Sequence, residues 1–266
     1  MKTFKPFLAI VVAIAFYSCS TVPLTGRSQL SLVSDDQVNP AAAASYRQLL
    51  SDPATKVVNT GTDAQRVKRI GGQLAAAIEK YLNTNGYANQ YSFQWEFNLI
   101  QSPEINAWCM PGGKVAVYSG LLPVSQTDAG LATVMGHEIG HAIARHSAER
   151  MSQQLALQAG GSAIGAAAGT KSAATQAVIS SLYGVGGQVT LLKFSRNQES
   201  EADRLGLTFM AMAGYDPNQA VSFWQRMAAQ SKGGTPPEFL STHPSDATRI
   251  ANIKRLIPEA MKYYKR

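Results

Sequence analysis

The sequence predicts an α+β fold that is mostly helical, with a small β-sheet or hairpin beside a central helix. Three observations support this prediction. Residues 92–99 alternate polar and apolar side chains, as a half-buried strand does. The 266 residues show no internal repeat and are enough for one large domain with its own core. Apolar residues also recur at helical spacing, most clearly at Leu131, Val134, Met135, Ile139 and Ile143.

The other elements follow in chain order. Helices are predicted at residues 36–51 and 63–82, the second opened by a capping box of Thr62 and Gln65. A turn at Pro111–Gly113 leads into a strand at Lys114–Tyr118, which makes residues 103–118 a hairpin. Further on we expect loosely packed helices within 155–192, a helix from Asp216–Pro217 to about Gln230, a loop at 233–237 and a final helix at 245–257.

The central helix carries the most informative motif, His137-Glu138-Ile139-Gly140-His141. Ser125 or Thr127 can cap its start. Residues four apart on a helix differ by roughly 40° and about 6 Å of rise, so both histidines can reach one metal ion. Glu138 lies about 100° further round, near enough to bond a metal-held water without being a ligand. The spacing therefore predicts a hydrolytic zinc site.

Two further features of this helix need an explanation. Gly136 and Gly140 each cost about 1 kcal/mol relative to Ala, and together they leave one stripe of bare backbone. We expect another segment to approach closely there. His146 lies about 140° off the ligand face and is predicted to be structural or bonded to a neighbouring helix.

A catalytic zinc usually has three protein ligands, and a second acidic helix offers the third. Glu199 and Glu201 point about 200° apart, so only one of them can face the metal. Glu199 has Asp203 one turn on, where a carboxylate can accept the free ring N–H of a ligand histidine. We therefore assign Glu199 as the ligand and Asp203 as the partner of a histidine, and expect Glu201 in a salt bridge with Arg204 or Arg196.

These motifs resemble the gluzincin zinc metallopeptidases that include the CAAX prenyl protease and HtpX, and in particular the soluble periplasmic BepA and LoiP lipoprotein branch. The pattern is His-Glu-x-x-His followed by Glu-x-x-Ala-Asp, and the similarity runs from about residue 30 to about 257. Further matching stretches are Asn106-Ala107, Pro111-Gly112-Gly113-Lys114, Ser119-Gly120-Leu121-Leu122, Ser195-Arg196 and Thr242-His243-Pro244-Ser245.

The resemblance implies a zincin-type metalloprotease domain with one Zn²⁺ per chain. It implies His137, His141 and Glu199 as ligands and Glu138 as general base. It also implies that His243, with Arg249 six residues on, approaches the metal and steadies the transition state. A buried structural histidine is the alternative interpretation of His243.

The expected hairpin suggests how a substrate binds. An exposed strand edge pairs with an extended peptide through main-chain hydrogen bonds. We expect Asn106 and Ala107 to provide this substrate strand, and unfolded or extended proteins to be the partners. Residues 155–192 are a candidate mobile cover over the site, and polar residues interrupt each apolar run there before it could span a membrane.

The N-terminus is predicted to be a processing segment. Residues 1–18 form a lipoprotein signal peptide, with Lys2 and Lys5 before a short apolar run. Cys19 then becomes the lipidated first residue of a membrane-anchored tether, 19–34, and residues 35–266 form a single metallopeptidase domain. The residue after Cys19 is Ser20 and not the aspartate that holds many lipoproteins at the inner membrane. We therefore expect a periplasm-facing lipoprotein of the bacterial outer membrane. An ordinary signal peptide with an incidental cysteine is the alternative.

Composition excludes other classes of partner. The net charge is +7, or +5 without Lys2 and Lys5, and it is spread along the chain with no nucleic-acid-binding module. We therefore expect no nucleic-acid partner. With Cys19 lipidated, Cys109 has no disulfide partner and is interpreted as a small buried hydrophobe.

The sequence thus predicts a zinc-dependent endopeptidase of the cell envelope that removes misfolded or unassembled envelope proteins. Metal-activated water, with Glu138 as the base, would cut the peptide bond. The alternative is a zinc-stabilised holdase or assembly factor for outer-membrane proteins that cuts rarely. Envelope assembly machinery is then a candidate partner. An exopeptidase would need a group that captures a chain terminus, and none is visible in the sequence.

Overall fold

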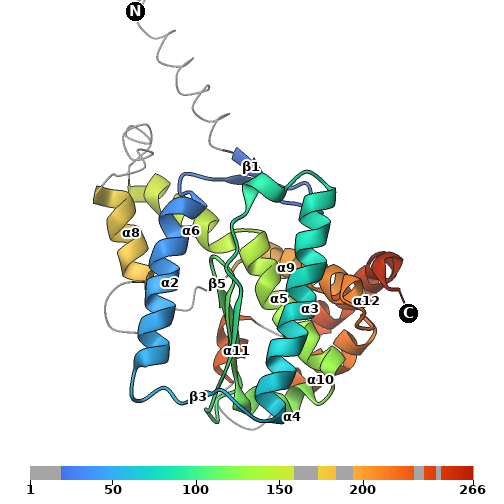
Figure 1. Ribbon diagram of the computed structural model, residues 1–266. Helices are drawn as coiled ribbons and strands as arrows, with labels where there is room; N and C mark the ends of the chain where they lie inside the picture. Colours follow the sequence, from blue (N-terminus) through green and yellow to red (C-terminus); the bar gives the residue numbers. More distant parts are fainter. Residues whose placement is uncertain (1–18, 159–172, 184–193, 231–236, 244–246, 266) are drawn as a thin grey trace, which may run out of the picture.

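The computed structural model describes residues 19–158, 173–183, 194–230, 237–243 and 247–265. A small sheet lies in the middle of the molecule, with helix α2 (Asp35–Ser51) on one face. Helices α3 (Thr62–Thr84) and α5 (Asp128–Ile143) cover the other face (Figure 1). Helix α9 (Arg196–Met212) packs behind α5. The predicted mostly helical α+β fold is therefore confirmed.

The remaining helices surround this centre. They are α4 (Leu122–Ser125), α6 (His146–Gln158), α8 (Ala173–Tyr183), α10 (Gln219–Ala229), α11 (Glu238–Thr242) and α12 (Ala247–Ala260), with 3-10 turns η1 (Ala88–Gln90), η2 (Ser119–Leu121) and η3 (Met261–Tyr263). The helices predicted at 36–51, 63–82 and 216–230 are confirmed within a few residues. The final helix is described from Ala247 and runs three residues past the predicted end, to Ala260.

The sheet has the strand order β3 (Val57–Val58), β4 (Glu96–Ile100), β6 (Lys114–Tyr118), β5 (Ala107–Met110). Strands β4 and β6 are parallel, and β5 and β6 are antiparallel. The hairpin was predicted correctly, and β5 is an edge strand. The alternation predicted for 92–99 is present, but the ladder begins only at Glu96. Before it, Gln94 N donates to the Gly112 carbonyl of the turn.

The start of α3 corrects one prediction. Gly61, with a φ of 92°, is the N-cap, and no side chain caps the helix. Thr62 is already the first helical residue, so it cannot form the expected capping box with Gln65. Capping boxes occur instead at Ser34–Gln37 and Ser195–Gln198, at the starts of α2 and α9.

Residues 19–34 also differ from the extended tether that we expected. Strands β1 (Cys19–Thr21) and β2 (Ser28–Leu30) pair with each other, and Val22 between them is fully buried in the main core. The backbone N–H of Leu32 donates to Ser152 Oγ on α6 at 2.9 Å. Apolar and hydrogen-bonding side chains hold the segment on the domain, so the domain begins before residue 35. The predicted signal peptide, residues 1–18, lies outside the described residues.

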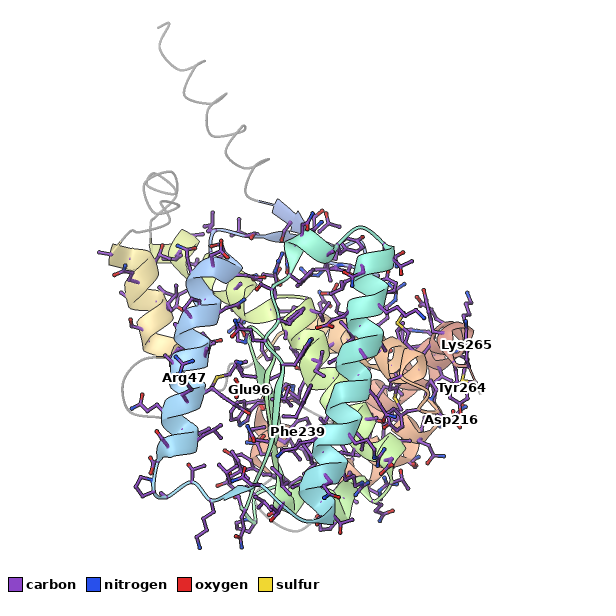
Figure 2. The ribbon with its side chains drawn as sticks, in the orientation of Figure 1. Arg47, Glu96, Asp216, Phe239, Tyr264 and Lys265 are labelled. Carbon is purple, nitrogen blue, oxygen red and sulfur yellow. The ribbon has the colours of Figure 1, made fainter. Side chains whose placement is uncertain are left out.

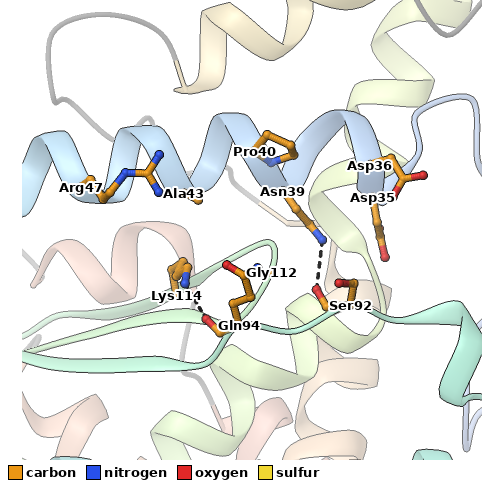
Figure 3. A pocket seen from close by; sticks show the side chains of 10 residues that line it. All are labelled: Asp35, Asp36, Asn39, Pro40, Ala43, Arg47, Ser92, Gln94, Gly112 and Lys114. Atoms are coloured by element: carbon orange, nitrogen blue, oxygen red, sulfur yellow. Dashed lines mark hydrogen bonds between the residues drawn. The ribbon is translucent and has the colours of Figure 1, made fainter.

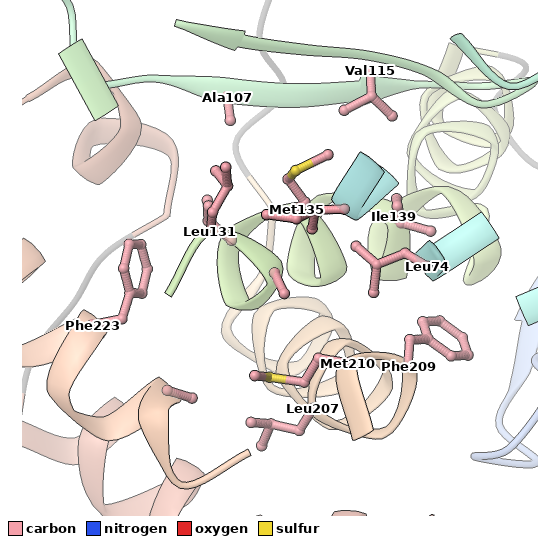
Figure 4. Close-up of a cluster of buried hydrophobic side chains, with 14 of the residues drawn as sticks. Leu74, Ala107, Val115, Leu131, Met135, Ile139, Leu207, Phe209, Met210 and Phe223 are labelled. Carbon is pink, nitrogen blue, oxygen red and sulfur yellow. The ribbon is translucent and has the colours of Figure 1, made fainter. Parts of the chain in front are cut away.

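The core centres on α5, whose Leu131, Met135 and Ile139 are fully buried (Figure 4). Phe239 of α11 lies in the same interior, whereas Lys265 is exposed at the C-terminal side (Figure 2). The close approach expected at the glycine stripe is confirmed. A Cβ on Gly136 would lie 3.0 Å from the Gly206 carbonyl oxygen of α9, and one on Gly140 would lie 2.8 Å from that of Ala202.

The predicted cover, 155–192, is described only in part. Helix α8 packs on α2 and α6, where Val178 and Ile179 meet Val38, Met151 and Leu155. Residues 159–172 and 184–193 lie outside the described part, as does most of the loop predicted at 233–237. Among the helices that the structure describes, none has the length and apolar character needed to cross a bilayer.

Candidate metal centre

Helix α5 holds the His-Glu-x-x-His motif in the interior. Thr127 is its N-cap and accepts a hydrogen bond from Gly130 N at 3.0 Å, so of the two predicted caps this one is correct. Asp128 in the first turn is held by Arg66 and Arg69. His137, Glu138 and His141 are all buried.

Helix α9 brings Glu199 to the same place. Glu199 Oε2 lies 3.5 Å from His137 Nε2, and Glu199 Oε1 lies 3.4 Å from His141 Nε2. The two ring nitrogens are 3.1 Å apart. The opposed faces predicted for Glu199 and Glu201 are present, with Glu199 toward the histidines.

His243, the C-cap of α11, completes the cluster. Its Nδ1 lies 2.9 Å from Glu199 Oε1 and 3.2 Å from His137 Nε2, while its Nε2 is 3.7 Å from Glu138 Oε1. The ring stacks on Phe239 at 4.7 Å. His137, His141, Glu199 and His243 each offer one ligand atom, and these atoms all lie within 4.8 Å of one another.

This cluster fits a single metal ion. Four ligands at about 2.0–2.1 Å around a tetrahedral zinc lie about 3.3 Å from each other. The distances of 3.1 Å between His137 and His141, and 3.2 Å between His137 and His243, match that value. Among the described residues, Glu138 Oε1 and Glu199 Oε2 are buried without a hydrogen bond, although Arg249 Nη1 lies 3.1 Å from Glu199 Oε2. A cation at the centre of the cluster would give Glu199 Oε2 the partner that it lacks.

Asp203 lies behind His137, and Arg249 lies beside its ring, with Nη2 3.2 Å from both ring nitrogens. Asp203 Oδ1 is 2.9 Å from His137 Nδ1, as the sequence predicted. Arg249 donates to both oxygens of Asp203, at 2.7 and 2.9 Å, and its guanidinium lies 3.5 Å from the Trp224 ring centre. A carboxylate at this place fixes the ring proton on Nδ1 and leaves Nε2 free for a metal.

The electrostatics of the cluster are dominated by burial. Burial raises the pKa of Glu138 to about 7, helped by Glu199 and Asp203 and opposed by His243 and Arg249. Burial lowers the pKa of His141 well below its usual value. Burial would raise the pKa of Glu199, but hydrogen bonds from His137, His141 and His243 lower it overall. The lowered pKa values of Glu199 and His141 favour an ionised carboxylate and a neutral ring, which are the states that a metal needs.

His146 is bonded to a neighbouring helix, as predicted. Its Nε2 lies 3.0 Å from Glu201 Oε2 on α9 and its Nδ1 lies 2.8 Å from His141 Nδ1. The partner predicted for Glu201 was wrong: Glu201 pairs with Arg27 at 2.7 Å, whereas Arg204 pairs with Glu259 at 2.7 Å.

Sequence reasoning missed Arg27, Thr25 and Phe194. Thr25 Oγ1 donates to Glu201 Oε1 at 2.5 Å, and the Phe194 ring stacks on His141 at 4.0 Å. Nothing in the sequence pairs residues 25–27 with α9. Phe194 had a signal, because an apolar residue just before a capping serine is typical of a helix entry that packs on its own helix or a neighbour.

Asn106 and Ala107, predicted to form an exposed substrate-binding strand edge, are not exposed. Asn106 and Ala107 are buried, and Ala107 packs into the main core. A small pocket beside His141, of about 20 Å³, is lined by Cys109 at the other end of β5. Burial and Glu138 raise the pKa of the Cys109 thiol well above its usual value, which agrees with an inert, half-buried side chain.

A larger hollow of about 410 Å³ adjoins that pocket, with which it shares Asp35, Asn39 and Gly112. It lies between α2 and the turn that precedes β6 (Figure 3). Asn39 on α2 donates to the Ser92 carbonyl of the opposite wall at 3.3 Å, and within that wall Lys114 donates to the Gln94 carbonyl at 2.5 Å. The hollow thus adjoins the small pocket that reaches His141.

Comparison with known proteins places this site in a family. The pattern that describes peptidase family M48 matches residues 65–257, which include every residue of the cluster. The chain belongs to peptidase family M48. It is therefore a member of a family of metalloendopeptidases, and the gluzincin resemblance is confirmed at this level.

Several M48 relatives are similar over most of the chain. The mitochondrial metalloendopeptidase OMA1 of Schizosaccharomyces pombe is 32% identical, over 90% of this chain and 66% of the relative. OMA1 of Bos taurus is 32% identical, over 96% of this chain and 49% of the relative. The beta-barrel assembly-enhancing protease of Escherichia coli is 31% identical, over 89% and 47%. The chain thus spans about half to two thirds of these relatives, and the envelope lipoprotein branch stays a prediction.

Proposed function

We propose that this M48 chain is a zinc-dependent endopeptidase that cuts with water and forms no covalent intermediate. The observation that carries the proposal is the set of four ligand atoms within 4.8 Å, with Glu138 buried beside it. When bound, zinc polarises a carbonyl and acidifies water.

Each residue has a role in this proposal. His137, His141 and Glu199 hold the metal, and Asp203 keeps the proton of His137 on Nδ1. Glu138 takes the proton of the attacking water on its carboxylate and returns it to the leaving amine. A pKa of about 7 suits a group that must both accept and release a proton near neutral pH.

The place of His243 bears on how the site opens. A catalytic zinc keeps one position for water, yet His243 Nδ1 is a fourth candidate ligand here. We propose that this arrangement is a closed state, which His243 leaves when substrate enters. The oxyanion-stabilising role expected from the resemblance requires the ring to bond a substrate oxygen after that movement.

The proposed substrates are unfolded or extended proteins. An extended chain can reach the cluster through the hollow at α2 and pair with the edge strand β5, near Cys109. We propose a location in the bacterial cell envelope, through lipidated Cys19, and a role in quality control there. The name of the E. coli relative, a beta-barrel assembly-enhancing protease, supports this location, whereas the OMA1 relatives are named as mitochondrial.

Metal removal tests the proposed activity. We expect purified protein to cleave an unfolded substrate such as reduced casein, to stop when a chelator is added, and to recover on addition of one equivalent of zinc. The readout is fragment formation on a gel together with bound zinc by elemental analysis. Cleavage that continues in metal-free protein would refute the proposal.

Replacement of His243 separates its two roles. We expect His243→Ala to keep stoichiometric zinc, since three ligands remain, and to raise the cleavage rate because the closed population disappears. Lys254→Ala, at an exposed position in the middle of α12, is the control. A rate that falls about 10²–10³-fold would instead assign His243 to the oxyanion.

A further inference from the structure

The partner of the second imidazole of the cluster is unusual. His137 has a carboxylate directly behind it, Asp203, whereas His141 has another imidazole. His146 Nδ1 lies 2.8 Å from His141 Nδ1, and both rings are buried. The carboxylate comes one step later, as Glu201 Oε2 at 3.0 Å from His146 Nε2.

The positions of the protons along the series His141, His146 and Glu201 follow from the groups at its two ends, the metal site and the carboxylate. His141 can offer Nε2 to a metal only if its proton is on Nδ1, and that N–H then donates to His146 Nδ1. His146 Nδ1 must therefore accept, which leaves its own proton on Nε2. That N–H faces Glu201 Oε2 and donates to it. One arrangement of protons satisfies all three groups.

The N-terminal segment binds Glu201, the last residue of this hydrogen-bonded series. Arg27 Nε donates to Glu201 Oε2 at 2.7 Å, and Thr25 donates to the other oxygen at 2.5 Å. Arg27 also donates hydrogen bonds to both carboxylate oxygens of Glu149, at 2.7 and 3.1 Å. The loop is tight, since Val22 N donates to the Arg27 carbonyl at 2.9 Å and Gly26 N to the Val22 carbonyl at 3.0 Å. Arg27 is thus placed by the backbone and not by the reach of its side chain alone.

We propose that Arg27, Glu201 and His146 are positioning residues that orient His141 for the metal, so that the N-terminal loop 22–27 is part of the metal centre. The inference rests on the proposed zinc site and adds a relay to it. Residues that orient a ligand histidine typically change metal affinity by about 10–100-fold when they are lost. The segment that follows Cys19 then links the proposed membrane anchor to the site.

Zinc affinity and ligand geometry test the relay in the complete chain. We expect His146→Leu to weaken zinc binding about 10–100-fold in competition with a chromophoric chelator. His146→Gln should retain more affinity, because its amide can both accept from His141 and donate to Glu201. Glu201→Gln and Arg27→Met should weaken binding about tenfold. In cobalt-substituted protein each should alter the visible absorption of the metal, and kcat should fall while KM stays.

Glu259→Gln is the matched control, because Glu259 pairs with Arg204 of the same helix α9 at a half-exposed site. It should leave zinc affinity and the cobalt spectrum unchanged. If the relay variants bind zinc within twofold of the parent and give its cobalt spectrum, while their metal-free forms melt earlier, the residues are only structural and the relay is refuted. If the parent chain itself retains no zinc, the proposed function and the relay both fail.

Discussion

Replacement of Glu138 by Gln is expected to lower peptide cleavage by about 10³-fold while zinc stays bound. The amide keeps the shape of the side chain but cannot take the proton of the attacking water. Zinc content should not change, because Glu138 is outside the set of four candidate ligands. The measurements are kcat on an unfolded protein substrate and the zinc content of the same sample.

The same variant separates a protease from a holdase. If the chain acts by binding unfolded proteins, Glu138→Gln retains its effect in cells although cleavage is lost. A variant that cleaves at the parental rate would remove Glu138 from the mechanism. Asp63→Asn is a suitable control, since that acidic residue is exposed in the first turn of α3, away from the hollow.

Stability of the metal-free protein gives a second readout of Glu138→Gln. The folded-state pKa of Glu138 is raised to about 7 by burial, so the folded chain favours the protonated form. Its stability is complete below the pKa of the unfolded chain, about 4.3, and falls as pH rises toward 7. The Gln variant has no proton to lose there. The difference in free energy of unfolding between variant and parent should therefore grow from pH 4 to pH 7 and then level off.

The features of the site that the sequence predicted involve residues close to each other in the sequence. His137 and His141 share a turn of α5, and Glu199 and Asp203 share a turn of α9, so helical periodicity alone decided which side chains face together. The same geometry placed Glu201 and His146 away from the ligand face. The distances from Glu199 to His137 and His141, and from His146 to Glu201, agree with these predicted orientations.

The contacts that the sequence did not predict join distant segments. Arg27 meets Glu201 across 174 residues, and a long side chain with several candidate acids gives no clue to its partner. The N-terminal segment lacks any clear periodicity, so it was interpreted as a tether, although Val22 is buried in the core. At α3 a glycine with positive φ replaced the expected side-chain cap, and such a backbone entry leaves only a weak signal.

Replacement of Gly206 by Ala should destabilise the protein by about 2 kcal/mol, although alanine is the better helix former. A Cβ at Gly206 would lie 2.7 Å from His137 N, 2.8 Å from Gly136 C and 3.0 Å from Gly136 O. All three atoms belong to the backbone of α5, so no side chain can turn aside and the two helices must separate. The measurement is the free energy of unfolding of the metal-free protein in urea.

The separation should also weaken zinc binding, because α5 carries His137 and His141 while α9 carries Glu199. Gly72→Ala is the matched control: Gly72 is exposed within α3, and a Cβ there meets nothing within 4 Å. That substitution should stabilise the protein by up to about 1 kcal/mol and leave zinc affinity unchanged. If Gly206→Ala gained stability as the control does, backbone contact between α5 and α9 would not be what sets the spacing of the ligands.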